Sequence, residues 1–428
     1  MSAIIHHGDC LEVMPTLDAD SVDAIVTDPP YHLTDIARTF QGKSGSIDAR
    51  TGRQRSESRR KSAGFMGKAW DGGDVAFRPE TWAEALRVAK PGAYLVAFGG
   101  TRTFHRLTCA IEDAGWEIRD CLMFLHGQGF PKSLDVSKAI DKAAGAEREV
   151  IGFDAAKHRP NRDKHLLAGQ PGGGGKLKAD NGATTTAPAT DAARQWDGFG
   201  TALKPSFEPI ILARKPLIGT VAANVQEHGT GALNIDGCRI GTEVLSAHGG
   251  GRNDVPRCYG AGKGIPSILA GSNPRVGRWP ANVVLDECAA ELLDRQSGAV
   301  GNHGGAGAYL SRSGFGGGIV TPAPSDTGGA SRFFYCAKAS QSERNAGLNG
   351  ERCTHPTVKP LALMRWLARL TTPPGGVVLD PFAGSGSTGI GTLQQGYSFI
   401  GIEREAAYVE IARKRIADAQ SQLTLAVA

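Results

Sequence analysis

The stretch Val377-Val-Leu-Asp-Pro-Phe-Ala-Gly-Ser-Gly-Ser-Thr-Gly389 combines a short apolar strand, a glycine-rich turn and the start of a helix that extends to Gln395. Glycines let the backbone approach a ligand closely, and a helix start offers free N–H groups. A second apolar strand, Ser398–Ile402, follows and leads into Glu403, at a distance from the turn where an acidic residue commonly binds ribose hydroxyls. This order of elements predicts an α/β sheet with a site for a nucleotide-like ligand. The run lacks the Lys-Ser/Thr of a phosphate-binding loop and the spacing of the dinucleotide fingerprint.

A second strand-like run near the start of the chain leads into the turn Asp28-Pro29-Pro30-Tyr31. A carboxylate and a backbone carbonyl can both accept hydrogen bonds from one exocyclic amine, and two prolines stiffen the turn because each fixes φ. The tyrosine offers a flat face on which a nucleobase can stack. The alternative is an ordinary Pro-Pro turn after a buried strand, with a surface tyrosine. The glycine-rich stretch favours the first interpretation.

Together, these two motifs resemble those of the amino-group DNA methyltransferases, in the permuted class whose catalytic motif precedes the cofactor motif. Further segments agree with the resemblance, namely Ile4–His7 with Gly8-Asp9, Ala93–Phe98, His355-Pro-Thr-Val-Lys-Pro360 and Gly401-Ile-Glu403. The resemblance implies a Rossmann-like α/β fold, circularly permuted and with large insertions. We expect a mostly parallel, doubly wound sheet with one antiparallel strand, formed by residues 204–215 beside the strand Glu117–Leu125.

The resemblance also implies a cofactor, S-adenosyl-L-methionine, and a set of site residues. The implied catalytic residues are those of the turn, Asp28, Pro29, Pro30 and Tyr31. The implied cofactor-binding residues are Asp9, Thr357, Lys359, Asp380, Phe382, Gly384, Gly386 and Glu403. In the family the residue matching Asp9 approaches the adenine, and the one matching Glu403 binds the ribose. We expect the acidic residues to meet at the carboxyl ends of their strands, with the Asp28 and Asp380 strands as neighbours.

The implied reaction is direct in-line transfer of a methyl group to N6 of adenine in duplex DNA, after the base flips out. Cytosine N4 of DNA and an RNA base remain alternative targets. A third hypothesis is a catalytically inactive DNA-binding protein that keeps the fold. No metal is expected, because the eight cysteines are scattered without a Cys-x-x-Cys pair. A Cys/His site that uses Cys238, Cys258 and Cys288 stays open as a lesser alternative.

The motifs divide the chain into five predicted regions. These are the catalytic half of the core at 1–132, a mobile insertion at 133–203, a core strand at 204–219, a target-recognition region at 220–351 and the cofactor-binding half at 352–428. Residues 41–68 carry eight Lys/Arg against two Asp/Glu, whereas the whole chain has a net charge of only +5. This segment predicts phosphate contact, or else a solvated loop.

No apolar run has the length needed to span a bilayer, and the N-terminus lacks the pattern of a signal peptide. We therefore expect a cytoplasmic, nucleoid-associated protein of a bacterium, phage or prophage. Its expected partner is DNA, with no membrane. The oligomeric state stays open between monomer and homodimer. No nuclease motif is evident, so the chain resembles a stand-alone modification enzyme, and a partner endonuclease of a restriction-modification system remains an open question.

Overall fold

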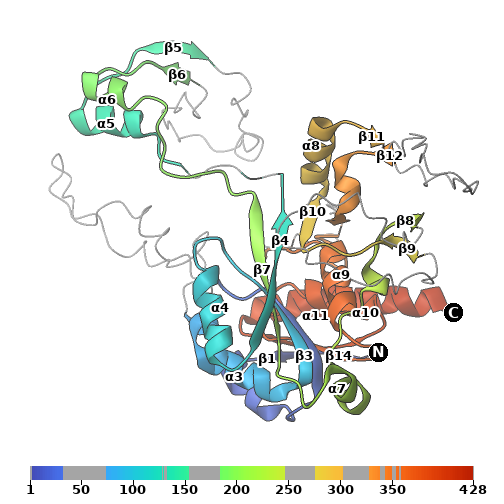
Figure 1. Cartoon of the computed structure of the whole chain (residues 1–428). Coiled ribbons are helices and arrows are strands. Elements are labelled where there is room, and N and C mark those ends of the chain that lie inside the picture. The colour runs from blue at the N-terminus through green and yellow to red at the C-terminus, as the bar shows by residue number, and fades with distance from the viewer. Residues whose placement is uncertain are drawn as a thin grey trace, which may run out of the picture. The chain divides into compact units, whose positions relative to one another are not determined.

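The computed structural model describes residues 2–31, 74–127, 129, 133–153, 184–245, 275–301, 327–337, 343–348, 353–355 and 358–427. The chain forms two compact units. The larger unit combines residues 1–128 with 206–428, and the smaller unit consists of residues 129–205. The larger unit contains the central sheet and all of the predicted site residues that the structure describes (Figure 1).

A nine-stranded sheet forms the core of the larger unit, in the order β1-β15-β14-β2-β3-β7-β4-β10-β13. Its strands are β1 (Ala3–His7), β2 (Val22–Thr27), β3 (Ala89–Phe98), β4 (Glu117–Leu125), β7 (Phe207–Arg214), β10 (Val283–Asp286), β13 (Tyr335–Ala337), β14 (Val377–Asp380) and β15 (Ser398–Glu403). Strand β7 pairs antiparallel with both β3 and β4, and every other pairing is parallel. The prediction of a mostly parallel α/β sheet with one antiparallel strand is confirmed.

Both faces of the sheet are buried, so its strands form two separate apolar cores. In β3, Tyr94, Val96 and Phe98 belong to one core, whereas Leu95 and Ala97 belong to the other. This alternation follows from the two-residue period of a strand. The first core is covered by α9 (Leu361–Thr371), α10 (Ser387–Leu393) and α11 (Ala406–Val427), and the second by α1 (Cys10–Val13), α3 (Pro79–Val88) and α4 (Phe104–Asp113).

Helix α9 shows how the sequence specifies this packing. Pro360 is its N-cap residue, and Leu363, Trp366, Leu367 and Leu370 are all buried in the first core. Fully burying such a side chain contributes roughly 1.5–3 kcal/mol.

Helix α3 and strand β3 follow each other without an intervening loop, although Lys90-Pro-Gly92 lies where the strand begins. In the structure Ala89 already belongs to β3, where it pairs with Val22. The Ser21 N–H also donates to the Val88 carbonyl. Pairing with β2 therefore extends β3 through a proline and a glycine that would usually stop a strand.

Residues 220–351 contribute two strands to the central sheet, which sequence analysis did not predict. Strand β10 pairs with β4, and β13 pairs with β10, so the sheet continues beyond the β4 edge. The signal was present, because Val283-Val-Leu-Asp286 repeats the tetrapeptide Val377-Val-Leu-Asp380 of β14. Asp286 also caps α8 (Glu287–Ser297), since its side chain accepts from the Ala289 N–H. The same region forms α7 (Val221–His228) and the antiparallel pair β8 (Ile240–Leu245) and β9 (Arg275–Arg278).

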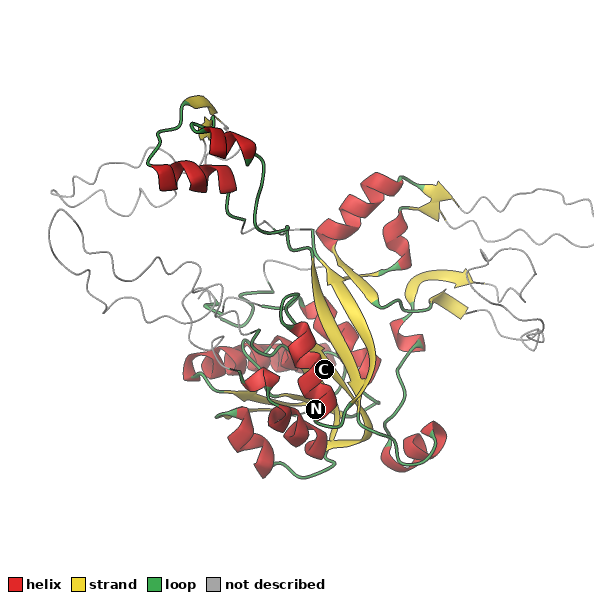
Figure 2. Cartoon of the chain, turned by 60° about the vertical axis from the view of Figure 1, so that its left-hand side comes forward, coloured by secondary structure: helices red, strands yellow, loops and turns green. Residues whose placement is uncertain are grey.

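The smaller unit combines α5 (Val136–Ala144) and α6 (Asp191–Gln195) with the antiparallel strands β5 (Val150–Phe153) and β6 (Thr184–Thr186) (Figure 2). Its centre is the buried Asp141, which pairs with Arg148 at 2.8 Å and accepts from the Thr190 hydroxyl at 2.7 Å. Burial acts to raise the pKa of Asp141, but these donors and the Ala189 N–H hold that pKa below its ordinary value. A carboxylate therefore ties its two helices to its strands.

Candidate active site

Four acidic residues lie at one edge of the sheet, because four neighbouring parallel strands end there. Strands β1, β15, β14 and β2 are consecutive in the sheet. They lead into or end at Asp9, Glu403, Asp380 and Asp28, respectively. The register pairs His7 with Glu403, Gly401 with Asp380, and Leu379 with Ile25, so the four strand ends are level to within a few residues. The Asp28 and Asp380 strands are direct neighbours, as predicted.

Asp380 links the two motifs that are far apart in the sequence. Its carboxylate accepts from the Thr27 hydroxyl at 2.6 Å, from the Thr388 hydroxyl at 2.6 Å and from the Phe382 N–H at 3.0 Å. The side chain is 1% exposed. Burial raises the pKa of Asp380 from 3.8 to about 6, against the effect of its three hydrogen bonds. The residue thereby fixes the start of the glycine-rich turn against the strand that carries the Asp28-Pro-Pro-Tyr turn.

Asp28 is held by one of its two carboxylate oxygens. Its Oδ1 accepts from the Tyr31 hydroxyl at 2.8 Å and lies 3.3 Å from the Lys359 Nζ. Burial raises the pKa of Asp28 above its ordinary value, and the positive charge of Lys359 opposes this rise. The Tyr31 carbonyl accepts from the Thr103 hydroxyl at 3.0 Å, which fixes the end of the turn. The Asp28-Pro-Pro-Tyr turn is therefore a rigid support for a single carboxylate.

Lys359 contacts the Asp28-Pro-Pro-Tyr turn, and its predicted contact with the cofactor stays a prediction. Its ammonium lies 2.5 Å from the Glu208 carboxylate, donates to the Tyr31 hydroxyl at 3.1 Å and lies over the Phe98 ring at 4.4 Å. Burial acts to lower the pKa of Lys359, but the carboxylates of Asp28 and Glu208 outweigh it and raise that pKa. The lysine is therefore a largely buried cation between two carboxylates, with 11% of its side chain exposed.

The glycine-rich turn depends on backbone conformations that suit glycine. Gly384 and Gly386 have φ values of 52° and 78°. A Cβ at Gly384 would lie 3.0 Å from the His355 Nε2. The Gly384 N–H donates to Glu403 Oε2 at 2.8 Å, and the Glu405 N–H donates to Oε1 at 2.7 Å. Burial raises the pKa of Glu403 despite these two bonds. Glu403 is thus fixed against the turn, with lone pairs left on both oxygens.

The remaining predicted site residues have structural contacts of their own. Asp9 caps α1, since its Oδ1 accepts from the Leu11 N–H at 2.9 Å. The Phe382 ring lies 6.4 Å from that of Trp82 and packs against the second core. Pro29 is buried and Pro30 is partly buried within the turn. Thr357 lies outside the described residues, and so do residues 41–68, for which we predicted phosphate contact.

Two residues that border this site were not predicted from the sequence. Glu208 is an acidic residue beside the apolar run Pro209–Ala213 of strand β7, and that contrast was its only signal. Arg415 of α11 is buried under the glycine-rich turn, where it donates to the Ser385 carbonyl at 2.6 Å. Its other nitrogen donates to the Glu343 carbonyl at 3.1 Å. An arginine on a helix with many charged residues gives no indication that it lies under the glycine-rich turn.

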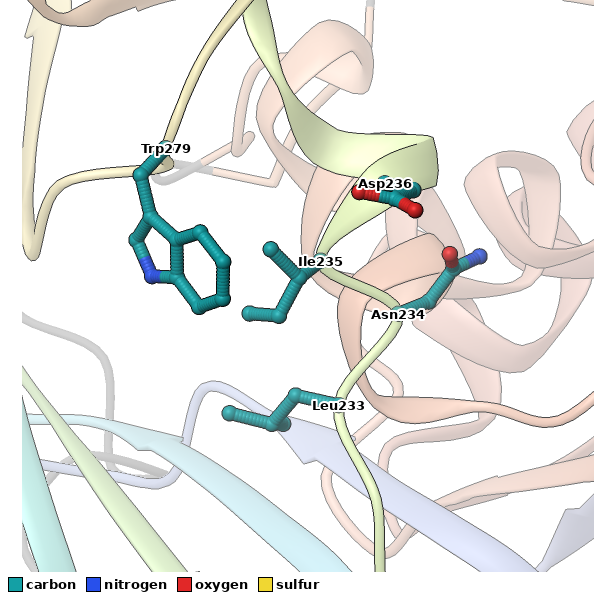
Figure 3. Close-up of a pocket in the computed structure, with 5 residues that line it drawn as sticks. All are labelled: Leu233, Asn234, Ile235, Asp236 and Trp279. Carbon is teal, nitrogen blue, oxygen red and sulfur yellow. The ribbon is translucent and has the colours of Figure 1, made fainter. Parts of the chain in front are cut away.

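A separate hollow lies between η7 (Asp236–Cys238) and β9, with a volume of about 330 Å³ (Figure 3). It is lined by Leu233, Asn234, Ile235, Asp236 and Trp279. The Arg239 guanidinium lies 5.5 Å from the centre of the Trp279 ring and bonds Asp236 at 2.7 Å. None of the four acidic residues at the sheet edge lines this hollow.

The described part of the chain contains neither a candidate metal-binding cluster nor a candidate membrane-spanning helix. Its His, Cys, Asp and Glu side chains form no group of three or more that could hold a metal ion. Cys258, one member of the alternative Cys/His site, lies outside that part. No helix within it has the length and apolar character needed to cross a membrane.

Comparison with protein families adds an observation independent of this geometry. Residues 326–414 match the model of the N6/N4 DNA methylases, described as DNA methylase. Over this segment the chain is similar to that family. The matched segment contains Asp380, the glycine-rich turn and Glu403. The Asp28 turn lies outside it, on the strand that pairs with β14.

Two curated relatives match over a short region. The chain is 47% identical over 62 residues to the type II methyltransferase M2.DpnII of Streptococcus pneumoniae, which is 14% of this chain and 23% of that protein. It is 44% identical over 62 residues to the DNA adenine methyltransferase YhdJ of Escherichia coli K12, which is 14% of this chain and 21% of that protein. The match therefore spans less than a quarter of either relative.

Solved structures of DNA methyltransferases resemble the chain only distantly. The M1.HpyAVI–SAM complex aligns with a TM-score of 0.36 and 15% identity, over 96% of this chain and 99% of that chain. The cytosine-N4-specific PvuII DNA methyltransferase aligns with a TM-score of 0.42 and 12% identity, over 99% of this chain and 93% of that chain. The strand order and register of this chain itself define its α/β fold.

Proposed function

We propose that the chain transfers a methyl group from S-adenosyl-L-methionine to N6 of adenine in DNA. The observation that carries this proposal is the position of the Asp28-Pro-Pro-Tyr turn directly beside the glycine-rich turn, on the paired strands β2 and β14. A support for an exocyclic amine and a support for a nucleoside cofactor then lie at one sheet edge. The DNA methylase match over residues 326–414 gives the chemistry that such a pair would perform.

The residues at the sheet edge fit this cofactor. S-Adenosylmethionine would supply an electrophilic methyl group on a positively charged sulfonium. Glu403 would accept hydrogen bonds from the ribose hydroxyls, and Asp9 would lie toward the adenine. Gly384 and Gly386 let the backbone approach the ligand without side-chain obstruction. Asp28 and Asp380 add negative charge nearby, which suits a cationic ligand.

The catalytic turn would hold and activate the amine. An aromatic amine is a poor nucleophile, because its lone pair is delocalised into the ring. Hydrogen bonds from its two N–H groups to an Asp28 oxygen and the Pro29 carbonyl favour a pyramidal nitrogen with a localised lone pair. The nitrogen lone pair forms the new N–C bond in line with the leaving sulfur, and Asp28 stabilises the positive charge that develops on nitrogen. The methylated nitrogen then loses one proton, for which Asp28 is the nearest carboxylate base.

The base must leave the helix to reach this turn, because its amine is inaccessible inside a duplex. Tyr31 is the proposed stacking partner of the flipped base. Adenine is the proposed target because the relative YhdJ is named as an adenine methyltransferase. The family model spans both N6 and N4 methylases, so cytosine N4 is the main competing target. The order of the motifs supports the permuted class. Because the proposed substrate is DNA, we propose that the enzyme acts in the cytoplasm with the nucleoid.

Methyl transfer from tritiated S-adenosylmethionine tests this function. Purified chain is incubated with unmethylated genomic DNA or RNA, and the product is digested to nucleosides and separated. Label in N6-methyldeoxyadenosine supports the proposal. Label in N4-methyldeoxycytidine would identify cytosine N4 as the target instead, and label in RNA nucleosides would identify an RNA base. Absence of label from every nucleic acid would leave the inactive DNA-binding protein as the better hypothesis. The Asp28→Asn variant is the matched control, since it keeps the size of the side chain and removes the charge.

A further inference from the structure

Glu208 belongs to the same edge of the sheet as the catalytic turn because β7 runs antiparallel. The start of β7 therefore lies beside the carboxyl ends of β3 and β4. The Gly99 N–H, just after β3, donates to the Pro209 carbonyl at 2.9 Å. Glu208 is thus fixed on a central strand of the sheet, and its side chain is 30% exposed. A carboxylate in this position has no role in the reaction as described so far.

The Lys359 ammonium connects Glu208 to Asp28. An ammonium group has three N–H donors. Three oxygens surround it, those of Glu208 at 2.5 Å, Tyr31 at 3.1 Å and Asp28 at 3.3 Å. Two of its donors bond Glu208 and Tyr31, and Asp28 lies within ion-pair distance, so the lysine has little freedom to move. Removing Glu208 would free one donor and loosen the group that holds Asp28.

The contacts on Asp28 are asymmetric. Tyr31 and Lys359 both engage Oδ1, and no other contact of Asp28 is seen among the described residues. A carboxylate that is held by one oxygen presents the other in a fixed direction. Proximity and orientation account for a large part of enzymatic rate enhancement, so a fixed acceptor matters for the amine.

We propose that Glu208 and Lys359 are positioning residues for methyl transfer, which hold Asp28 by Oδ1 so that Oδ2 faces the amine. This inference rests on the proposed function. Glu208 has a second effect through its charge. Asp28, Lys359 and Glu208 together carry one net negative charge, whereas Asp28 and Lys359 alone carry none. The amine nitrogen becomes positive during transfer. Because Glu208 leaves the group with a net negative charge, the group still attracts this nitrogen, whereas Lys359 alone would cancel the charge of Asp28.

Opposite charge effects on Asp28 make the network measurable. The titratable groups that face Asp28 are Lys359, Glu208, Tyr31 and Asp380, the last of which lies on the neighbouring strand β14. Burial is the largest cause that raises the pKa of Asp28, Lys359 lowers it, and Glu208 raises it. Glu208→Gln should therefore lower the pKa of Asp28, and Lys359→Gln should raise it. A side chain needed only for folding would not produce shifts of opposite sign.

The direct experiment titrates Asp28 by carbon-13 NMR in full-length protein with labelled aspartate carboxyls, with the signal assigned by Asp28→Asn. Glu208→Gln should move the midpoint down and Lys359→Gln should move it up, each by roughly one pH unit or more. Glu117→Gln is the matched control, because Glu117 bonds Arg214 of the same strand β7 at 2.6 Å. It should leave the Asp28 midpoint in place. Unchanged midpoints, or shifts of the same sign in both variants, would overturn the inference.

Methyl transfer on the same proteins tests the catalytic part. Glu208→Gln should reduce kcat about tenfold or more with little change in KM for the cofactor, and it should move the acid limb of the pH–rate profile to lower pH. Glu208→Asp, which keeps the charge, should recover part of the rate even where Glu208→Gln unfolds. A Glu208→Gln rate equal to that of Glu117→Gln overturns the inference alone. A wild-type chain that labels no nucleic acid, yet shows the NMR shifts, overturns the proposed function and the catalytic part of this inference with it.

Discussion

Asp380 provides a prediction whose magnitude follows from its burial. The carboxyl has a pKa of about 6 in the folded chain, against an ordinary value of 3.8. Between these two pH values the folded state binds more protons than the unfolded state, so stability falls as the pH rises through this window. A difference of about two pKa units corresponds to roughly 3 kcal/mol, since one unit is worth about 1.4 kcal/mol.

Asp380→Asn should remove this pH dependence. The amide keeps the shape of the side chain and never ionises, so the free energy of unfolding of the variant relative to wild type should rise by about 3 kcal/mol between about pH 3 and pH 8. Urea unfolding followed by the fluorescence of the buried Trp82 and Trp366 measures the difference at each pH. Thr388→Val removes one donor to the ionised carboxylate and should enlarge the pH dependence. A stability difference between Asp380→Asn and wild type that stays constant with pH would refute the reasoning.

Three further predictions concern the turn and the cofactor site. Asp28→Asn should reduce methyl transfer at least about 100-fold while calorimetry shows unchanged cofactor affinity, and near-normal turnover would contradict the role of its charge. Glu403→Ala leaves the Gly384 N–H without its carboxylate partner. It should weaken cofactor binding roughly 10–100-fold, as measured by calorimetry, and an unchanged dissociation constant would contradict the role of Glu403. Gly384→Ala forces a Cβ into left-handed backbone beside His355, at a cost of roughly 1–3 kcal/mol, so differential scanning should show a melting temperature lower by a few degrees.

The sequence predicted the central fold because its strongest signals are local. The run Val377–Asp380 is apolar and is followed at once by glycines, and the strand and helix after it obey the same periodicities. We predicted the pairing of β14 with β2 from the general rule that ligands bind at the carboxyl ends of strands in an open α/β sheet. No local pattern in either segment indicates that they are in contact. Local patterns thus determined both the elements and the edge at which the acidic residues meet.

The missed features depend on contacts between distant segments. Glu208 and Lys359 are separated by 151 positions and meet only because β7 runs antiparallel to its neighbours. Arg415 reaches the Ser385 carbonyl through helix packing, for which a single arginine on a helix gives no signal. Strands β10 and β13 are only four and three residues long, so their place in the sheet is set by pairing with β4 rather than by their own periodicity.

A crystal structure of the full chain with a non-reactive S-adenosylmethionine analogue would show whether both motifs serve one site. We predict ribose hydroxyls on Glu403 and the methyl-bearing end of the ligand between Asp380 and Asp28, open toward the Oδ2 atom of Asp28. A ligand seated in the hollow beside Trp279, or one whose reactive end points away from Asp28, would contradict this prediction.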